Sequence, residues 1–152
     1  MTYLKVLAIA LTAIILVPSG AHLFELPGKI GLEQGAYFTV QGIYAGWSLF
    51  AVPIFAAILA NGALFFVARR HHPSSAWLAL GSGGLITINL VIFFIWVFPA
   101  NQATQNWTTQ PENWELLRQQ WEYGHAANAF IVFAAFLMTA LAASLPERRA
   151  QA

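Results

Sequence analysis

The sequence predicts an all-α integral membrane protein, a four-helix bundle that forms one domain over residues 1–152. Two features of its composition support this fold class. Hydrophobic residues make up 59% of the chain and charged residues only 9%, whereas a soluble domain carries roughly 25% charged residues. So few charges could not cover the surface of a soluble domain of this length. The third observation is that four stretches are long and apolar enough to cross a bilayer.

A spanning helix needs about 20 predominantly apolar residues. The four stretches lie at about 6–24, 44–68, 76–98 and 125–145, and none contains Lys, Arg, Asp or Glu. Backbone polar groups in hydrocarbon must be bonded within their own segment, so these spans are expected to be helical. The first stretch has an alternative interpretation as a cleaved signal peptide, since Lys5 precedes the apolar run and small residues follow at Ser19, Gly20 and Ala21.

The distribution of basic residues predicts how the bundle sits in the membrane, because Lys and Arg are concentrated on the cytoplasmic side. Both termini and the turn 69–75 are expected to be cytoplasmic, with the loops 26–43 and 99–124 on the outer side. We therefore expect a multi-pass protein of the bacterial inner membrane, with the lipid bilayer as its partner. A formal net charge of +1 gives no basic footprint for nucleic acid. The residues that set this orientation are Lys5, Arg69, Arg70, Arg148 and Arg149.

The second outer loop is predicted to hold a short amphipathic helix over 112–123 that continues into the fourth span. Pro111 suits a first helical turn, and Glu112 and Glu115 suit its positive end. Residues three, four and seven apart share a helix face. One polar and aromatic stripe is therefore expected, and Arg118 and Glu122 are spaced to form an ion pair. The stripe consists of Arg118, Trp121, His125 and Asn128.

His22 and Glu25 share a face at the outer end of the first span. If the spans form a bundle, His22 and His125 are expected to meet in one outer pocket. Polar side chains that enter a span usually face the bundle interior or a cavity, which favours a functional role for His125 and Asn128. The alternative is that the Trp residues form an interfacial aromatic belt and that the charged residues are simply solvated.

Two asparagines lie inside the second and third spans. Asn61 and Asn89 differ in expected depth by roughly 12 Å at 1.5 Å per residue, so a direct hydrogen bond between them is not expected. Each is predicted to bond a neighbouring backbone or to link helices.

Three kinds of chemistry fit the outer residues. A carboxylate–imidazole metal site would use Glu122 and His125, three apart, with His22 and Glu25 in reverse order and Glu33 in addition. A bis-His haem would lie between His22 and His125. A cofactor-free pocket would bind a lipophilic aromatic molecule, with His125 as general base and Arg118 and Asn128 orienting it or stabilising an anion. The absence of Cys excludes thiolate metal sites.

The outer loops resemble those of the anthrone oxygenase-like family of small four-helix membrane proteins, in its bacterial branch. The resemblance rests on the segments 22–29, 101–104, 106–108, 111–114 and 117–126. It implies oxidation of anthrones to anthraquinones without metal or flavin. It also implies Trp121 and His125 as site residues, with Arg118 and Asn113 as the next candidates. Family members often carry an Arg two residues after the fourth-helix His, and this chain has Ala127 there, followed by Asn128.

These observations favour a cofactor-free oxygenase or binding protein for a lipophilic aromatic small molecule, with no metal. The alternatives are a non-catalytic membrane accessory or structural protein and, less favoured, a carboxylate–His metal or haem protein. The predicted catalytic residues are His125, Trp121 and Arg118. The predicted substrate-binding residues are Asn113, Asn128, His22, Glu25 and Glu122.

Overall fold

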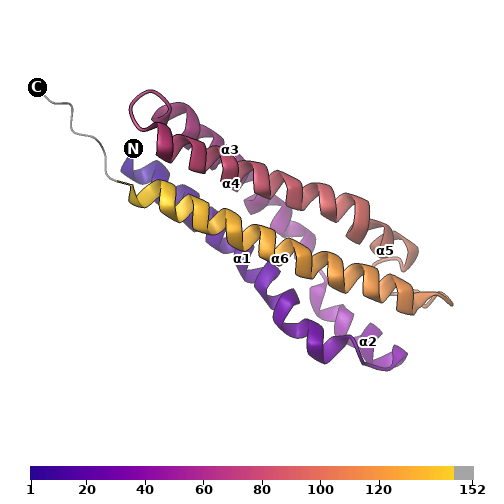
Figure 1. Ribbon diagram of the computed structural model, residues 1–152. Helices are drawn as coiled ribbons and strands as arrows, with labels where there is room; N and C mark the ends of the chain where they lie inside the picture. The colour runs from indigo at the N-terminus through magenta and orange to yellow at the C-terminus, as the bar shows by residue number, and fades with distance from the viewer. Residues whose placement is uncertain (146–152) are drawn as a thin grey trace, which may run out of the picture.

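The computed structural model describes residues 1–145 and shows four long helices packed side by side (Figure 1). They are α1 (Thr2–Lys29), α3 (Ala51–Ala68), α4 (Pro73–Ile92) and α6 (Trp114–Ser144). A π-helical turn, η3 (Phe93–Val97), continues α4 into α5 (Phe98–Ala103). Within these described residues there is no β-strand. The all-α bundle predicted from the sequence is confirmed.

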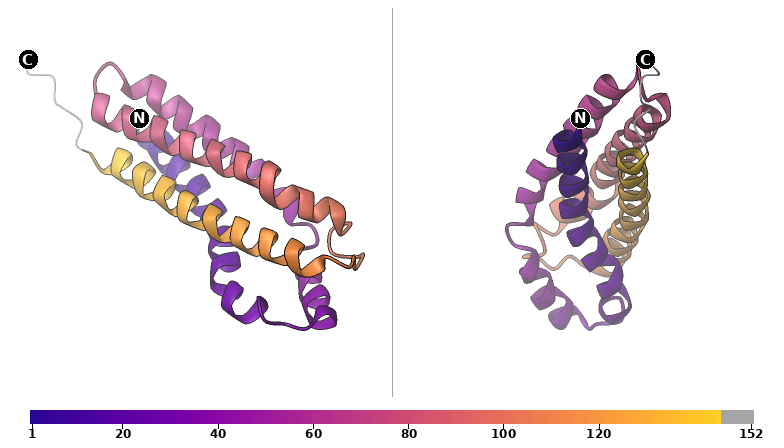
Figure 2. Two further views of the ribbon diagram at one scale, coloured as in Figure 1. Left: turned by 45° about the vertical axis from the view of Figure 1, so that its right-hand side comes forward. Right: turned by 90° about the vertical axis from the view of Figure 1, so that its left-hand side faces the viewer.

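The helices alternate in direction, and each packs against two neighbours in the order α1, α3, α4, α6 and back to α1. The start of α1, the α3–α4 turn and the end of α6 lie at one end of the bundle (Figures 1 and 2). The helix α2 (Gln34–Gln41) and the connection from α5 to α6 lie at the other end, called the outer end below. Four helical segments of the described chain are long and apolar enough to cross a membrane. Which end faces the cytoplasm stays a prediction from the basic residues.

The helices extend further at the outer end than the apolar stretches do. The first helix runs to Lys29 rather than to about residue 24, and the third runs through η3 and α5 to Ala103. The fourth begins at Trp114, so the helix predicted before the last span is continuous with it. Pro111 precedes this helix instead of occupying its first turn. An uninterrupted helix keeps its backbone groups hydrogen-bonded within itself, so these helices can continue beyond their apolar stretches.

The second span starts later than predicted because the chain turns before it. After α2, the chain forms two short 3₁₀ turns, η1 (Gly42–Tyr44) and η2 (Trp47–Phe50). Between them Gly46 has a φ of 86°, a left-handed conformation that glycine adopts without steric cost. Tyr44 therefore belongs to the outer loop and not to the span, which brings its ring toward the ends of α1 and α6.

A layer of neutral polar side chains joins all four helices in the middle of the bundle. Asn61 Nδ2 donates to the Ala57 carbonyl at 2.9 Å and to Thr12 Oγ1 at 3.4 Å, while Asn61 Oδ1 accepts from Thr139 Oγ1 at 3.0 Å. Ser82 and Thr139 hydroxyls lie 2.7 Å apart. The prediction that Asn61 bonds its own backbone or links helices is confirmed, and it does both.

The close approach of α6 to η3 depends on Gly124. A Cβ atom at this position would lie 2.8 Å from Val97 Cγ2 and 3.0 Å from the Trp96 ring. The first contact is shorter than real Cβ atoms show and the second is tight, so a side chain here would force its neighbours to shift. Small residues are what allow closely packed helices to approach in this way. Gly124 lies one residue before His125, so this contact also fixes where the histidine sits.

We expect Gly124→Ala to destabilise the bundle by about 1–3 kcal/mol relative to a matched control, because the added methyl group overpacks the contact with η3. The control is Gly84→Ala, where a Cβ atom would meet nothing within 4 Å. Thermal unfolding of both variants in the same detergent measures the difference. Equal melting temperatures for the two variants would show that the contact does not constrain α6.

Candidate functional site

Two histidines from different helices stack at the outer end of the bundle. His22 of α1 and His125 of α6 have ring centroids 4.0 Å apart, with 31° between their planes. His22 is only 5% exposed. The juxtaposition expected from the sequence is therefore observed. It arises because each histidine lies on the bundle-facing side of its helix and the two helices run next to each other.

Aromatic rings surround this histidine pair. The Trp121 ring meets His125 with centroids 4.2 Å apart and His22 with centroids 4.9 Å apart. Tyr44 and Trp47, which come from the first outer loop, lie 4.7 Å and 5.2 Å from the His22 ring. The imidazoles are thus held between indole and phenol rings, a setting with much apolar surface and few competing polar groups.

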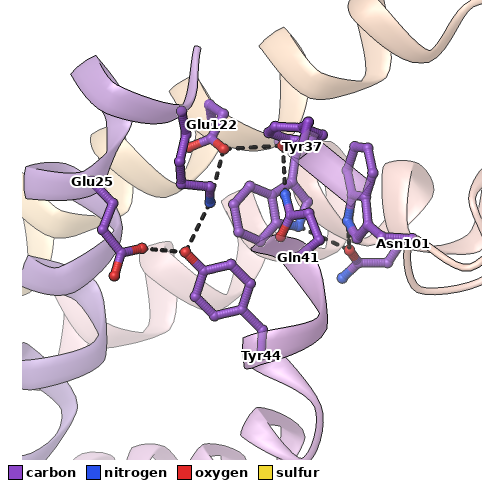
Figure 3. A network of polar contacts seen from close by, with 9 residues as sticks. Glu25, Tyr37, Gln41, Tyr44, Asn101 and Glu122 are labelled. Atoms are coloured by element: carbon purple, nitrogen blue, oxygen red, sulfur yellow. Dashed lines mark hydrogen bonds and ion pairs between the residues drawn. The ribbon is translucent and has the colours of Figure 1, made fainter. Parts of the chain in front are cut away.

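A buried ion pair lies beside the aromatic group. Lys29 Nζ is 2.9 Å from Glu122 Oε1, and the Glu122 side chain is 0% exposed. The same carboxylate oxygen accepts a hydrogen bond from Tyr37 at 3.0 Å. Lys29 also donates to the Tyr44 hydroxyl at 2.8 Å, and Tyr44 in turn donates to Glu25 (Figure 3). One hydrogen-bonded chain therefore connects the half-buried Glu25 with the fully buried Glu122.

Lys29 is held by aromatic faces as well as by oxygen atoms. Its ammonium lies 4.5 Å from the ring centroids of both Tyr44 and Trp121. A cation over an aromatic face gains more when it is removed from water, as this one is. Lys29 follows His22 by seven positions and Glu25 by four, so all three lie on the same face of α1.

The predicted pairing of Arg118 with Glu122 is wrong. Arg118 instead donates to the Leu32 carbonyl at 2.7 Å and lies 4.6 Å from the Trp114 ring centroid. Both predicted partners are buried on the bundle-facing side of α6. There each side chain contacts groups from other elements, and the Glu122 carboxylate pairs with Lys29 of α1. The idea that this is a solvated surface pair is wrong for the same reason.

The two tyrosines of the first outer loop are hydrogen-bond donors in this network. Burial raises the pKa of Tyr37 well above its ordinary value, and the Glu122 carboxylate raises it further. Burial also raises the pKa of Tyr44, with the hydrogen bond to Glu25 adding to the effect. Both phenols therefore stay protonated at physiological pH and can donate to the carboxylates that they face.

Several buried polar atoms in this region have no hydrogen-bond partner within residues 1–145. Almost all buried polar atoms in folded proteins are paired, so such a group of exceptions is informative. The three oxygens among them can only accept a hydrogen bond, and the histidine nitrogen can accept or donate according to its tautomer. A bound molecule that carries hydroxyl groups would match most of this set. The atoms are His22 Nδ1, Gln41 Oε1, Glu122 Oε2, Asn128 Oδ1 and Arg118 Nε.

A tightly wound loop between α5 and α6 helps to hold two indole rings of the site in place. Asn101 Oδ1 accepts hydrogen bonds from the Trp107 and Trp121 indoles, at 3.1 Å and 2.9 Å. Gln105, Asn106 and Trp107 have φ values of 48°, 55° and 65°. Non-glycine residues rarely adopt this left-handed conformation, and it persists only where surrounding contacts enforce it. The loop thereby presses Trp107 against Tyr37, with ring centroids 5.2 Å apart.

The structure brings most of the predicted site residues together and leaves one outside. Asn128 is buried one turn along α6 from His125. Asn113 lies apart from this group, exposed at the start of α6, where its side chain makes no capping hydrogen bond.

Several residues of the site were not predicted from the sequence. Among them only Lys29 carried a signal, which is its spacing from His22. The others are Tyr37, Gln41, Tyr44, Trp47 and Asn101, whose positions depend on how the outer loops fold.

The residues present do not fit the metal or haem alternatives. Within residues 1–145 no group of three or more His, Cys, Asp or Glu side chains is placed to hold a metal ion. Glu122 is paired with Lys29, and Glu33 is exposed at the start of α2. A haem between His22 and His125 would need its ring system to pass between two imidazoles that are already in contact.

Comparison with known proteins finds no matching family model, no similar curated protein and no similar solved structure. The resemblance of the outer loops to the anthrone oxygenase-like family therefore stays a prediction.

We expect Lys29→Met to lower the free energy of unfolding by about 3–5 kcal/mol, because it leaves the buried Glu122 carboxylate without a counter-charge. The double variant with Lys29→Met and Glu122→Gln removes both charges at nearly constant shape and should recover much of this loss. Denaturant unfolding in detergent measures all three proteins. A single variant as stable as the unmodified protein would mean that the ion pair does not hold the site together.

Proposed function

We propose that the protein binds a lipophilic aromatic small molecule at the outer end of the bundle and acts on it as a cofactor-free oxygenase, with His125 as general base. The observation that carries this proposal is the contact between His22 and His125, enclosed by aromatic rings and adjacent to the buried Lys29–Glu122 pair. Imidazole is the side chain most often used as a general base near neutral pH.

The surroundings of His125 support an aromatic substrate with an acidic proton. Trp121, Tyr44 and Trp47 form an aromatic cluster around the imidazoles, and aromatic surroundings favour a planar aromatic ligand. Unpaired acceptors on Glu122 and Asn128 suit a ligand hydroxyl. Arg118 keeps the anion-stabilising role predicted from the sequence, because its Nε is buried with no hydrogen-bond partner within residues 1–145 while its other nitrogen donates to Leu32.

The resemblance to anthrone oxygenases gives the reaction a definite form. His125 would remove a proton from the methylene carbon of an anthrone, and the resulting enolate would reduce O₂. Overall, the methylene group loses two hydrogen atoms and gains a carbonyl oxygen, and the second oxygen atom leaves as water. Each turnover consumes one O₂ and yields one anthraquinone, so no external reductant is needed.

The non-catalytic alternative also has support in the structure. The contacts from Glu25 through Tyr44 and Lys29 to Glu122 join side chains of this protein alone, and such a network can serve packing. In both cases we propose a multi-pass protein of the bacterial inner membrane. The end that carries Arg69 and Arg70 would face the cytoplasm, since basic residues concentrate there.

We expect His125→Ala to reduce oxygen consumption with anthrone by about 100-fold or more, since a positioned general base contributes typically 10²–10⁴-fold. Trp121→Ala should weaken anthrone binding, measured as a smaller ligand-induced rise in melting temperature. The control is His71→Ala, an exposed histidine in the α3–α4 turn at the opposite end. If all three variants fold and match the unmodified protein in both measurements, the oxygenase proposal is wrong and the accessory role is favoured.

A further inference from the structure

A concave feature lies at the end of the bundle opposite His22 and His125, at the turn between α3 and α4. It is an open groove of about 370 Å³. Pockets that bind small ligands begin at about 300 Å³, so this groove is large enough for a ligand of modest size. It lies at the end of the bundle opposite α2 (Figure 1), so it is separate from the site formed by His22 and His125. The residues that line it are Phe65, Arg69, Arg70, Pro73, Ala76 and Trp77.

The groove combines two cationic side chains with aromatic walls. Arg69 and Arg70 are exposed, and neither has a carboxylate within ion-pair distance in the described part of the chain. The Arg69 guanidinium lies 5.2 Å from the Phe66 ring centroid. Trp77 is 64% exposed and its ring packs against Phe65, with centroids 5.7 Å apart. Two unpaired guanidinium groups predict an anionic ligand, and guanidinium matches phosphate especially well because it can donate two parallel hydrogen bonds.

The surface next to the groove indicates where such a phosphate would come from. Apolar side chains of α3 and α4 are exposed directly beside it, namely Phe66, Val67, Trp77 and Leu80. Both helices belong to segments that are long and apolar enough to cross a membrane. A ligand in the groove would therefore have its charged part against the arginines and its neighbouring part against an apolar surface, which is how a phospholipid is built.

We propose that this groove binds the phosphate-bearing head group of an anionic phospholipid, whose acyl chains lie along the exposed apolar faces of α3 and α4. The expected orientation supports this choice, because the predicted cytoplasmic leaflet carries the negative surface potential that attracts basic residues. Trp77 would lie at the head-group level, where tryptophan is enriched in membrane proteins. The proposal is independent of the oxygenase proposal, since it concerns the other end of the bundle.

The test uses the full chain in nanodiscs of phosphatidylcholine to which phosphatidylglycerol is added in steps. Lipid retention by native mass spectrometry and the melting temperature are both measured. The unmodified protein should retain phosphatidylglycerol and melt higher as its fraction rises. The double variant with Arg69→Gln and Arg70→Gln should bind it about 30-fold more weakly, at about fivefold for each basic residue near the lipid surface. Trp77→Ala should weaken retention without changing its dependence on salt.

The matched control removes the same charge elsewhere, through Arg148→Gln and Arg149→Gln, which lie outside the described residues. Unchanged retention in this control, together with loss in the groove variant, supports a specific site. Equal losses in the two variants would show general attraction to an anionic surface and would overturn the proposal. So would full retention in the groove variant. An equal rise in melting temperature with inorganic phosphate in detergent would identify a free anion as the ligand instead of a lipid.

Discussion

The burial of the Lys29–Glu122 ion pair is the constraint on which the outer end of the bundle depends. Taking two charges out of water costs several kcal/mol per ion, and close contact with further hydrogen bonds must offset that cost. Tyr37 and Tyr44 provide these bonds, and both come from the first outer loop. The loop therefore has to fold back over the ends of α1 and α6. The pair thus connects the end of α1 and the loop that follows it with α6, which is distant in sequence, and it sets where the tyrosine rings stand relative to His22.

The position of the histidines follows from this arrangement and from the packing of α6. Gly124 lets α6 approach η3 closely, while the Asn101 side chain of the adjoining α5 holds the Trp121 indole by a hydrogen bond. Trp121 then contacts both imidazoles. The strained loop that ends at Trp107 completes this support, since its indole shares the same asparagine oxygen. A ring that enters this site would meet side chains held on several sides, which is the preorganisation that proton transfer requires.

Helical periodicity predicted the parts of this site that lie on long helices, because spacing alone determines which residues share a face. It brought His22 and His125 together, and it gave Asn61 its role in linking helices. It failed where the partner comes from another element. Glu122 was matched to Arg118 by spacing on one helix, but a bundle-facing carboxylate pairs across helices. Tyr44 had no signal at all, because its position depends on a glycine turn and on the return of the loop.

The two polar layers of the bundle differ in a way that bears on function. In the middle layer, neutral hydroxyl and amide groups such as Asn61 and Thr139 satisfy one another, as packing between membrane helices requires. In the outer layer, an oxygen of Glu122 and one of Asn128 are buried without a hydrogen-bond partner in the described part of the chain. Each unpaired buried group costs about 1–3 kcal/mol, and apolar residues of similar shape would avoid that cost. Packing alone accounts for the middle layer, whereas the outer layer holds acceptors to which the ligand that we propose would donate.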